Sequence, residues 1–337
     1  MRSEEIFQQA WQTTLNSPNM YLEGFRKGVE AASELGLSSF RKLLLLGVGG
    51  SGIVGDIVAA LKEPSTQIIV HSHKDITAPA WVGPDTLAVA VSYSGNTAET
   101  LMSSLDALSK GARLVAVSSG GRLTKVLSSK GVVVVRVSEG FEPRYAVPEM
   151  VGAAYGMLTG LDGFPASSFQ KAVEELADFL KTLDRNFGRE LSAAESFLNR
   201  IVVCVSHSHL AVAAHRLKAQ LNENAKHPAY AVLLPEASHN EIEGWTDMEK
   251  LAFVFLRSVF QHAIYSDVFD WMRDFVLSRG SVCRDVVIES SGFRAELLKH
   301  ICYADLVSVA LARLKNVNPF ELYTIPLLRP RLRKHLP

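Results

Sequence analysis

The sequence predicts an α/β protein built from two doubly wound parallel-sheet subdomains, and three observations support this prediction. The chain has 337 residues, of which 47% are hydrophobic, so it is long enough for about two domains with a core in each. From residue 42 onward, short apolar runs alternate with longer amphipathic segments, as strands and helices do around a parallel sheet. The same alternation starts again after residue 164.

The first half begins with apolar residues at helical spacing, so we expect a helical lead-in over residues 1–40 that packs on the first subdomain. The first subdomain itself is expected over residues 41–163. Short apolar runs predict strands at residues 43–46, 67–70, 86–91, 113–117 and 132–135. Helices are predicted between them, for example at residues 97–108, and a last one over residues 146–161. This helix ends at the turn sequence Asp162-Gly-Phe-Pro165, which predicts the domain boundary.

The second subdomain is expected over residues 164–337 and begins with a long helix over residues 168–184. Its strands are predicted at residues 201–205, 231–234, 251–255 and 286–289. A helix that ends near Leu221 follows the first of these strands, and a helix over residues 295–314 closes the domain. The two halves share an order of elements more than they share residues.

Composition excludes several classes of function. The 35 Lys and Arg balance the 35 Asp and Glu without a long basic block, which argues against nucleic acid as a partner. Cys204, Cys283 and Cys302 lie far apart and form no Cys-x-x-Cys pair, so neither a disulfide framework nor a zinc ribbon is indicated. The apolar stretch at residues 43–61 is rich in glycine and is interrupted by Asp56, which favours strand, turn and helix over a membrane span. We therefore expect a cytoplasmic protein, with no membrane contact, that binds a small molecule.

A glycine turn follows the first predicted strand. Gly47-Val-Gly-Gly-Ser-Gly52 matches the spacing of the dinucleotide fingerprint G-x-G-x-x-G. The fingerprint also needs an acidic residue at the end of the second strand, where this chain has Val70-His-Ser-His-Lys74 and only Asp75 nearby. A nicotinamide cofactor is therefore disfavoured, and a tight turn that serves only helix packing is the plain alternative.

A serine turn follows the strand at residues 86–91. Its sequence is Ser92-Tyr-Ser-Gly-Asn-Thr97-Ala-Glu-Thr100, at the expected start of a helix. Free backbone amides, the positive helix end and several hydroxyls together suit a phosphate monoester held without a fixed cation. An ordinary helix cap is the alternative, but one hydroxyl would suffice for that. The chain lacks G-x-x-x-x-G-K-[ST], so a nucleotide triphosphatase is not predicted.

The glycine turn and the serine turn resemble those of the sugar isomerase (SIS) domain. The segment Pro143-Arg144-Tyr-Ala146 also resembles a segment of that domain. Two further segments are similar to the archaeal and bacterial bifunctional phosphoglucose/phosphomannose isomerases, namely Asn222-Glu223-Asn-Ala-Lys226 and Pro235-Glu-Ala-Ser-His239-Asn-Glu-Ile-Glu-Gly-Trp245. The resemblance runs in consistent order from about residue 43 to the carboxyl end. It implies an SIS fold and a cytoplasmic isomerase of glycolysis and gluconeogenesis. Such an enzyme converts glucose 6-phosphate and mannose 6-phosphate to fructose 6-phosphate without a metal or a redox cofactor.

The resemblance also implies roles for particular residues. The phosphate is expected on Ser92, Ser94 and Thr97 with Ser51 beside them, and the sugar near the amides of Gly49 and Gly50.

Three further residues are implied in catalysis. Arg144 would stabilise the enediolate, unless it is a surface arginine paired with Glu142 or Glu149. Glu223 would move the proton between C2 and C1, the alternative being a solvated glutamate at a helix end. His239 would open the ring from across a dimer interface, which implies a homodimer; a capping or core histidine is the alternative.

The carboxyl end departs from the family pattern. Where the family has an Asp-Pro, a hydrophobic pair and a lysine that assists ring opening, this chain has Asn318-Pro319 and places Arg329 at the lysine position. Arginine keeps the charge but does not release its proton, so it can orient a hydroxyl but cannot act as a base. Leu322 stands where a hydroxyl-bearing residue helps to admit the mannose epimer.

Three alternatives remain open. One is an SIS regulator that binds a sugar phosphate, and a second is a relative that has lost catalysis because of Arg329. A third is another SIS enzyme, acting on an amino-sugar or pentose phosphate. The pairs His71-Ser-His73 and His207-Ser-His209 have metal-ligand spacing but lack a third ligand, so we expect loop residues and no metal.

Overall fold

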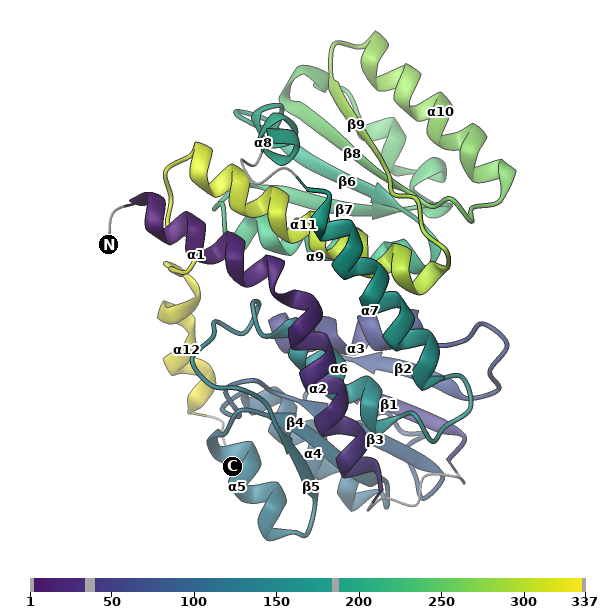
Figure 1. Cartoon of the computed structure of the whole chain (residues 1–337), viewed down its shortest axis with the longest axis vertical. Coiled ribbons are helices and arrows are strands. Elements are labelled where there is room, and N and C mark those ends of the chain that lie inside the picture. The colour runs from purple at the N-terminus through teal and green to yellow at the C-terminus, as the bar shows by residue number, and fades with distance from the viewer. Residues whose placement is uncertain (1–2, 34–39, 184–187, 335–337) are drawn as a thin grey trace. The chain divides into compact units, whose positions relative to one another are not determined.

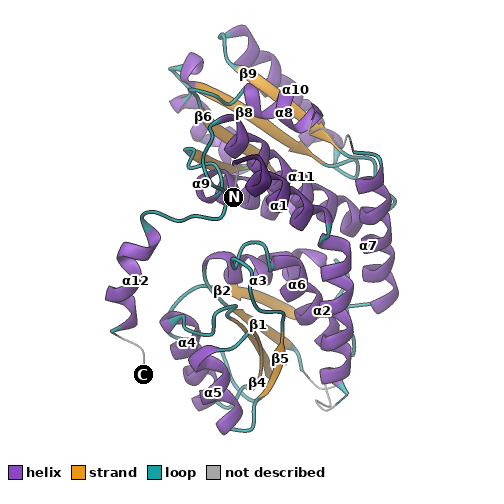
Figure 2. Cartoon of the chain, turned by 60° about the vertical axis from the view of Figure 1, so that its left-hand side comes forward, coloured by secondary structure: helices purple, strands orange, loops and turns teal. Residues whose placement is uncertain are grey.

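The computed structural model describes residues 3–33, 40–183 and 188–334, which form two compact α/β units (Figure 1). The first unit comprises Asn16–Gln170 and Leu322–Pro337, and the second comprises Met1–Leu15 and Lys171–Glu321. In each unit helices cover both faces of a sheet (Figure 2). The predicted fold class is confirmed.

The sheet of the first unit has five parallel strands in the order β2-β1-β3-β4-β5. Its strands are β1 (Lys42–Leu46), β2 (Ile69–His73), β3 (Thr86–Val91), β4 (Arg113–Ser118) and β5 (Val133–Arg136). Its helices are α2 (Ser17–Ala32), α3 (Gly49–Leu61), α4 (Ala98–Ser109), α5 (Gly121–Ser129) and α6 (Val147–Met157). The central strands β1 and β3 are buried on both faces, which explains their unbroken apolar sequence.

Helices α2 and α6 pack together through small residues. A Cβ atom on Gly24 would lie 2.0 Å from the carbonyl oxygen of Glu149, and one on Gly28 would lie 2.2 Å from that of Ala153. Gly152 of α6 is equally close to the backbone of α2. The two backbones can approach this closely only because glycine has no side chain.

The sheet of the second unit has four parallel strands in the order β7-β6-β8-β9. Its strands are β6 (Ile201–Ser206), β7 (Ala229–Leu233), β8 (Leu251–Arg257) and β9 (Val282–Val287). Its helices are α1 (Ser3–Leu15), α8 (Gly188–Glu195), α9 (Ala211–Glu223), α10 (Ala263–Ser278) and α11 (Phe293–Leu314), with 3₁₀ turns η1 (Ser208–Leu210), η2 (Glu236–His239), η3 (Glu241–Gly244) and η4 (Met248–Lys250). Helix α7 (Ala166–Lys181) runs from the first unit into the second, and α12 (Ile325–Arg333) lies in the carboxyl-terminal tail.

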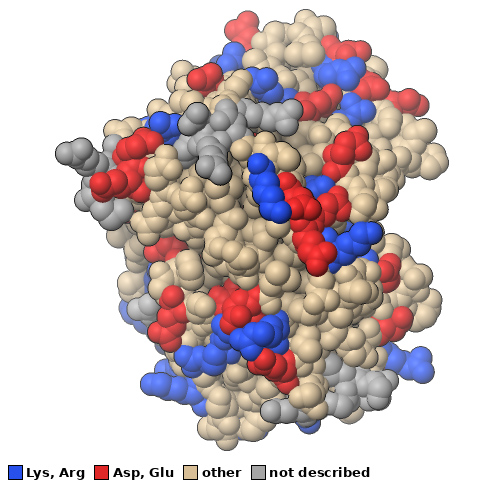
Figure 3. Space-filling model, in the orientation of Figure 1, with Lys and Arg blue, Asp and Glu red and all other residues tan. Residues whose placement is uncertain are grey.

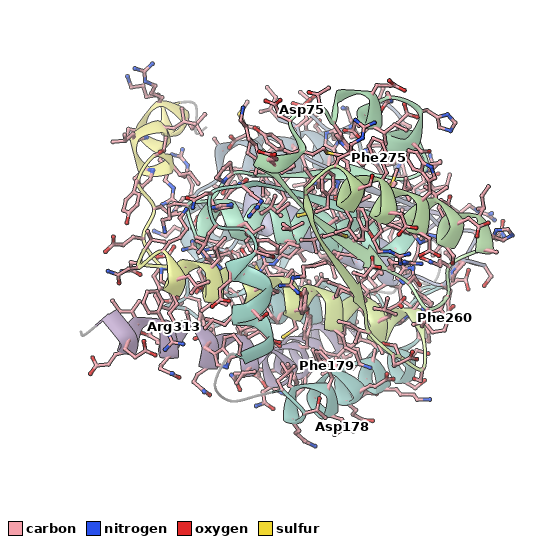
Figure 4. The ribbon with its side chains drawn as sticks, turned by 90° about the horizontal axis from the view of Figure 1, so that it is seen from above. Asp75, Asp178, Phe179, Phe260, Phe275 and Arg313 are labelled. Carbon is pink, nitrogen blue, oxygen red and sulfur yellow. The ribbon has the colours of Figure 1, made fainter. Side chains whose placement is uncertain are left out.

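The expected packing of the amino-terminal helices is wrong for one of them. Helix α2 packs on α6 of the first unit, but α1 packs on α11 of the second. Phe7 and Trp11 are buried there, and Arg313 donates to Glu4 at 3.2 Å. Figure 4 shows Arg313 beside the amino-terminal helix. Helices α1 and α2 therefore belong to different units.

Two predicted strands are displaced. The strand expected at residues 67–70 is β2 (Ile69–His73), so His71 and His73 are strand residues and not loop residues. The strand expected at residues 286–289 is β9 (Val282–Val287). Both are edge strands that mix polar with apolar residues and leave most positions exposed or half-buried, which gives a weaker signal than a buried apolar run. The predicted boundary at residues 162–165 lies between α6 and α7.

The surface carries charges of both signs. On the face shown in Figure 3, Lys and Arg side chains are interspersed with Asp and Glu. Among the described residues, no helix has both the length and the apolar composition needed to cross a membrane.

Candidate active site

The strand order of the first unit places the two predicted turns side by side. β1 and β3 are neighbours, and the chain leaves them toward opposite sides, to β2 and to β4. In open parallel sheets, ligands bind at such a switch point, at the carboxyl ends of the strands. The glycine turn follows β1 and the serine turn follows β3, and the amide of Tyr93 donates to Ser51 Oγ at 3.0 Å.

The glycine turn opens helix α3. Gly49 has a φ of +59°, in the left-handed region that favours glycine, and it starts the helix. A Cβ atom on Gly50 would lie 3.3 Å from the amide nitrogen of Arg144. Gly50 thus allows the loop that carries Arg144 to reach the glycine turn.

The serine turn holds its hydroxyls without using them as a cap. Ser92 is buried and its Oγ donates to Thr97 Oγ1 at 3.2 Å, whereas Ser94 is exposed. Thr97 is the N-cap residue of α4, yet its hydroxyl makes no capping hydrogen bond with any residue that the structure describes in that helix. The alternative of an ordinary helix cap is therefore not supported.

The turn between β4 and α5 supports the serine turn. Gly95 has a φ of +63°, and a Cβ atom there would lie 1.8 Å from the carbonyl oxygen of Gly120. A Cβ atom on Gly121 would lie 2.2 Å from the carbonyl oxygen of Ser94, and the Arg122 amide donates to Asn96 Oδ1 at 3.1 Å. Backbone contacts with the turn between β4 and α5 therefore fix the position of the serine turn.

Tyr93 connects the serine turn to the loop that carries Arg144. Its hydroxyl donates to the carbonyl of Ser138 at 3.0 Å and accepts from the amide of Phe141 at 2.8 Å. Burial and the nearby carboxylates, Glu149 first among them, raise the pKa of Tyr93, although the Phe141 bond opposes this. The hydroxyl therefore keeps the proton that it donates.

Arg144 is buried and does not lie on the surface, although it forms the pair with Glu142 that the alternative interpretation includes. Its side chain is only 2% exposed, and its Nη1 lies 3.8 Å from Glu142 Oε2. Glu149 instead forms a 2.7 Å ion pair with Lys27 and accepts from the amide and hydroxyl of Ser138. A buried guanidinium therefore lies in the loop beside the glycine turn.

Glu223 is the last residue of α9, in a turn whose other polar side chains are used for structure. Asn222 Nδ2 donates to the carbonyl of His227 at 2.8 Å, and Asn224 Nδ2 donates to Ser308 Oγ of α11 at 2.8 Å. Glu223 itself is half-buried. The neighbouring asparagines thus hold the turn that presents this carboxylate.

Lys226 anchors the start of the carboxyl-terminal tail. Its Nζ donates to the carbonyl of Asn318 at 2.6 Å and to that of Glu321 at 2.7 Å. From there the chain continues through Leu322, which is half-buried, to Arg329, which is exposed on α12.

The structure does not bring Glu223 and His239 together within one chain. Glu223 precedes β7 and His239, which is exposed at the end of η2, follows it. The two residues therefore lie beyond opposite ends of a five-residue strand, which is itself about 15 Å long.

Sequence reasoning missed the linking roles of Tyr93 and Lys226. Both residues lie inside the sequence motifs quoted above, and that location is the sequence feature that could have identified them. Among the described residues, no group of three or more His, Cys, Asp and Glu side chains is placed to hold a metal ion.

Comparison with known proteins gives consistent matches. Residues 189–332 match the model of the bacterial phospho-glucose isomerase C-terminal SIS domain. The bifunctional phosphoglucose/phosphomannose isomerase of Aquifex aeolicus is 31% identical over 303 residues, which cover 89% of this chain and 92% of the relative. The D-glucosamine-6-phosphate 4-epimerase of Sulfolobus acidocaldarius is also 31% identical over 303 residues, covering 88% of this chain and 90% of the relative.

A solved structure supports the fold. A hypothetical protein from Thermus thermophilus superposes with a TM-score of 0.77 at 15% identity, covering 99% of this chain and 94% of that chain. Because the identity over most of the chain reaches 31%, the relationship extends beyond the fold. The chain belongs to the bifunctional phosphoglucose/phosphomannose isomerase family.

Proposed function

We propose that the chain is an aldose–ketose isomerase that interconverts glucose 6-phosphate and mannose 6-phosphate with fructose 6-phosphate, without a metal or a redox cofactor. The observation that carries the proposal is the convergence of the glycine turn, the serine turn and the Arg144 loop at one switch point. Family membership supplies the reaction class. The proposed setting is a cytoplasmic homodimer in glycolysis and gluconeogenesis.

The phosphate is proposed to bind at the serine turn. Ser94 and Thr97 would donate to its oxygens, with Ser51 and the amides of α3 on the other side. Ser92 is buried and bonded to Thr97, so it would orient that hydroxyl. The sugar would lie near Gly49 and Gly50. This cradle neutralises a dianion with dipoles and needs no bound cation.

Proton transfer is assigned to Glu223 and Arg144. The Glu223 carboxylate removes the C2 proton of the open aldose, the C–H electron pair forms the C1–C2 double bond, and O1 takes a proton from solvent water to give the cis-enediol. Glu223 then returns the proton to C1, while the O2 hydroxyl gives its proton back to solvent and C2 becomes the ketone. The buried Arg144 cation stabilises the charge on the oxygens during both steps. Glucose and mannose differ only at C2, so both give the same enediol.

Ring opening is assigned to His239, which moves the proton from the O1 hydroxyl to the ring oxygen. The position of Glu223 and His239 at opposite ends of β7 supports two different active sites for them. Each site would combine Glu223 of one chain with the partner subunit's His239. The proposed assembly is therefore a homodimer in which each chain completes the other's site.

A second candidate is favoured by one observation. The relative named D-glucosamine-6-phosphate 4-epimerase is as similar to this chain as the isomerase from Aquifex aeolicus. The exposed Arg329 replaces a lysine of the isomerase pattern, at the step where ring opening would need assistance. An amino-sugar phosphate is therefore the alternative substrate, and a sugar-phosphate sensor is the alternative without catalysis.

The deciding experiment follows product formation from each sugar phosphate with EDTA present. Fructose 6-phosphate formed from glucose 6-phosphate and mannose 6-phosphate would support the proposal. Conversion of glucosamine 6-phosphate to its 4-epimer alone would support the second candidate, and binding without turnover would support the sensor. Loss of turnover on chelation would overturn the metal-free mechanism.

The base is tested by Glu223→Gln, which keeps the shape and removes the proton acceptor. We expect turnover to fall by about 10³-fold or more while sugar-phosphate binding is nearly unchanged. Glu249→Gln, at an exposed position in η4, is the matched control and should keep full activity. Retained turnover in Glu223→Gln would show that another group moves the proton.

A further inference from the structure

The two sheets repeat one strand order, so the second unit has a switch point of its own. The order β7-β6-β8-β9 corresponds to β2-β1-β3-β4, which pairs β6 with β1 and β8 with β3. The crevice between β6 and β8 is therefore the counterpart of the candidate phosphate site. Ser258 follows β8 directly, as Ser92 follows β3.

A carboxylate of the chain occupies this crevice. His209 Nε2, from η1 after β6, lies 2.7 Å from Oε2 of Glu296. Ser258 Oγ donates to the same oxygen at 2.7 Å, and the amide of Val259 donates to Oε1 at 2.7 Å. Glu296 comes from the first turn of α11, and its side chain is fully buried. The turn is ordered further by the amide of Phe260, labelled in Figure 4, which donates to Ser258 Oγ at 3.0 Å.

This carboxylate is held as an anion. Burial opposes its ionisation, but hydrogen bonds from His209, Ser258 and Val259 outweigh burial and hold the pKa of Glu296 below its usual value. A hydroxyl, a backbone amide and an imidazole are the donor types that bind phosphate and carboxylate ligands in proteins. The titratable groups that interact with it are His207, His209 and His300. The second switch point thus has the hydrogen-bond donors of an anion-binding site.

We propose that the crevice between β6 and β8 is a second anion site of this fold and that the Glu296 carboxylate is its permanent occupant. The chain fills this site from within, so only the switch point of the first unit is left for an external anion. A vacated site would accept a small carboxylate. The inference does not depend on which sugar phosphate the first unit binds.

The test uses Glu296→Ala with acetate, because acetate supplies the atoms beyond Cβ that this substitution removes. We expect saturating acetate to raise the melting temperature of the variant by about 3 °C or more, with a hyperbolic concentration dependence. Acetamide, the neutral analogue, should have no such effect. Wild type and Glu296→Gln, whose sites are filled, should not respond to either additive. An equal response of all three proteins to acetate, or none, would overturn the proposal.

If the alanine variant does not fold, Glu296→Gln tests the proposal instead, because glutamine keeps the shape of the side chain and removes its charge. Glu296 has a lowered pKa in the folded chain, so its contribution to stability is present above the unfolded value of 4.5 and is lost as the pH falls through the folded value. The gap in melting temperature between wild type and Glu296→Gln should be full at pH 7 and begin to close below about pH 4.5. A gap that does not change with pH would contradict the proposal.

Equilibrium dialysis of the wild type should find one inorganic phosphate per chain, and two would contradict the proposal.

Discussion

At the scale of single residues, Lys226 connects the turn of Glu223 to the tail. Its backbone has a φ of +47°, and its ammonium group holds the carbonyls of Asn318 and Glu321. A flexible lysine can satisfy two carbonyls at once because it carries three donors. The tail segment proposed to assist ring opening is thus fixed at its origin by the turn that carries the proposed base.

We predict that Lys226→Met slows the reaction mainly at ring opening. The turnover number for glucose 6-phosphate should fall by about tenfold, because the tail is no longer anchored. Erythrose 4-phosphate, which has no free hydroxyl for ring closure, should be affected much less. Lys226→Arg, which keeps the charge, is the control. Equal losses on both substrates would show that Lys226 supports only the fold.

Tyr93→Phe should disturb the Arg144 loop while leaving the phosphate site intact. The substitution removes the hydroxyl that bridges Ser138 and Phe141 but keeps the Tyr93 amide that donates to Ser51. We expect the turnover number to fall by about tenfold and the KM to change by less than about twofold. Tyr230→Phe, at a 60% exposed position on β7, is the control and should behave as wild type in steady-state kinetics.

At the scale of elements, the serine turn depends on its contact with the turn before α5. Gly95→Ala would place a methyl group 1.8 Å from a carbonyl oxygen, so the serine turn must move. We expect the affinity for sugar phosphate to fall by about tenfold or more and the melting temperature to drop. Gly131→Ala is the matched control, since it also has a positive φ of +74° but no atom within 4 Å of the added Cβ. It should cost about 1 kcal/mol of stability and leave the KM unchanged.

The packing of α9 on α11 rests on a buried ion pair. Arg216 binds Asp305 through two hydrogen bonds of 2.7 and 3.0 Å, and both side chains are largely buried. Asp305→Asn removes the buried carboxylate that pairs with the Arg216 guanidinium, so the free energy of unfolding in urea should fall by about 3–5 kcal/mol. Asp178→Asn breaks an exposed pair with Lys181 and should cost less than about 1 kcal/mol (Asp178 is labelled in Figure 4). A small loss for Asp305→Asn would show that α9 relaxes around Arg216.

Central elements could be predicted from the sequence better than peripheral ones. The buried strand at residues 86–91 was predicted with its bounds, because both of its faces are apolar. The edge strands β2 and β9 are displaced from their predicted positions, because most of their residues are exposed or only half-buried. The glycine and serine turns were located from local sequence. The Tyr93 and Glu296 side-chain contacts join residues 37 to 87 positions apart across the fold, so no local pattern contains them.

At the scale of the whole molecule, the proposed sharing of His239 predicts complementation between two inactive variants. Glu223→Gln and His239→Ala should each be inactive alone. When they are refolded together in equal amounts, half of the dimers are mixed, and each mixed dimer has one intact site. The mixture should therefore regain about a quarter of the wild-type activity. No recovery, although mass spectrometry detects mixed dimers, would place both groups of each site on one chain.

The path of the chain between its two units has a consequence for synthesis. Helix α1 belongs to the second unit, and the partner on which it packs, α11, begins only at Phe293. On the ribosome, at about 5–20 residues per second, the apolar face of α1 with Phe7 and Trp11 waits roughly 15 to 60 s for that partner. The first unit can complete its sheet during this interval. Helix α1 is thus synthesised long before the helix that buries it, and its exposed face is a natural target for chaperones during translation.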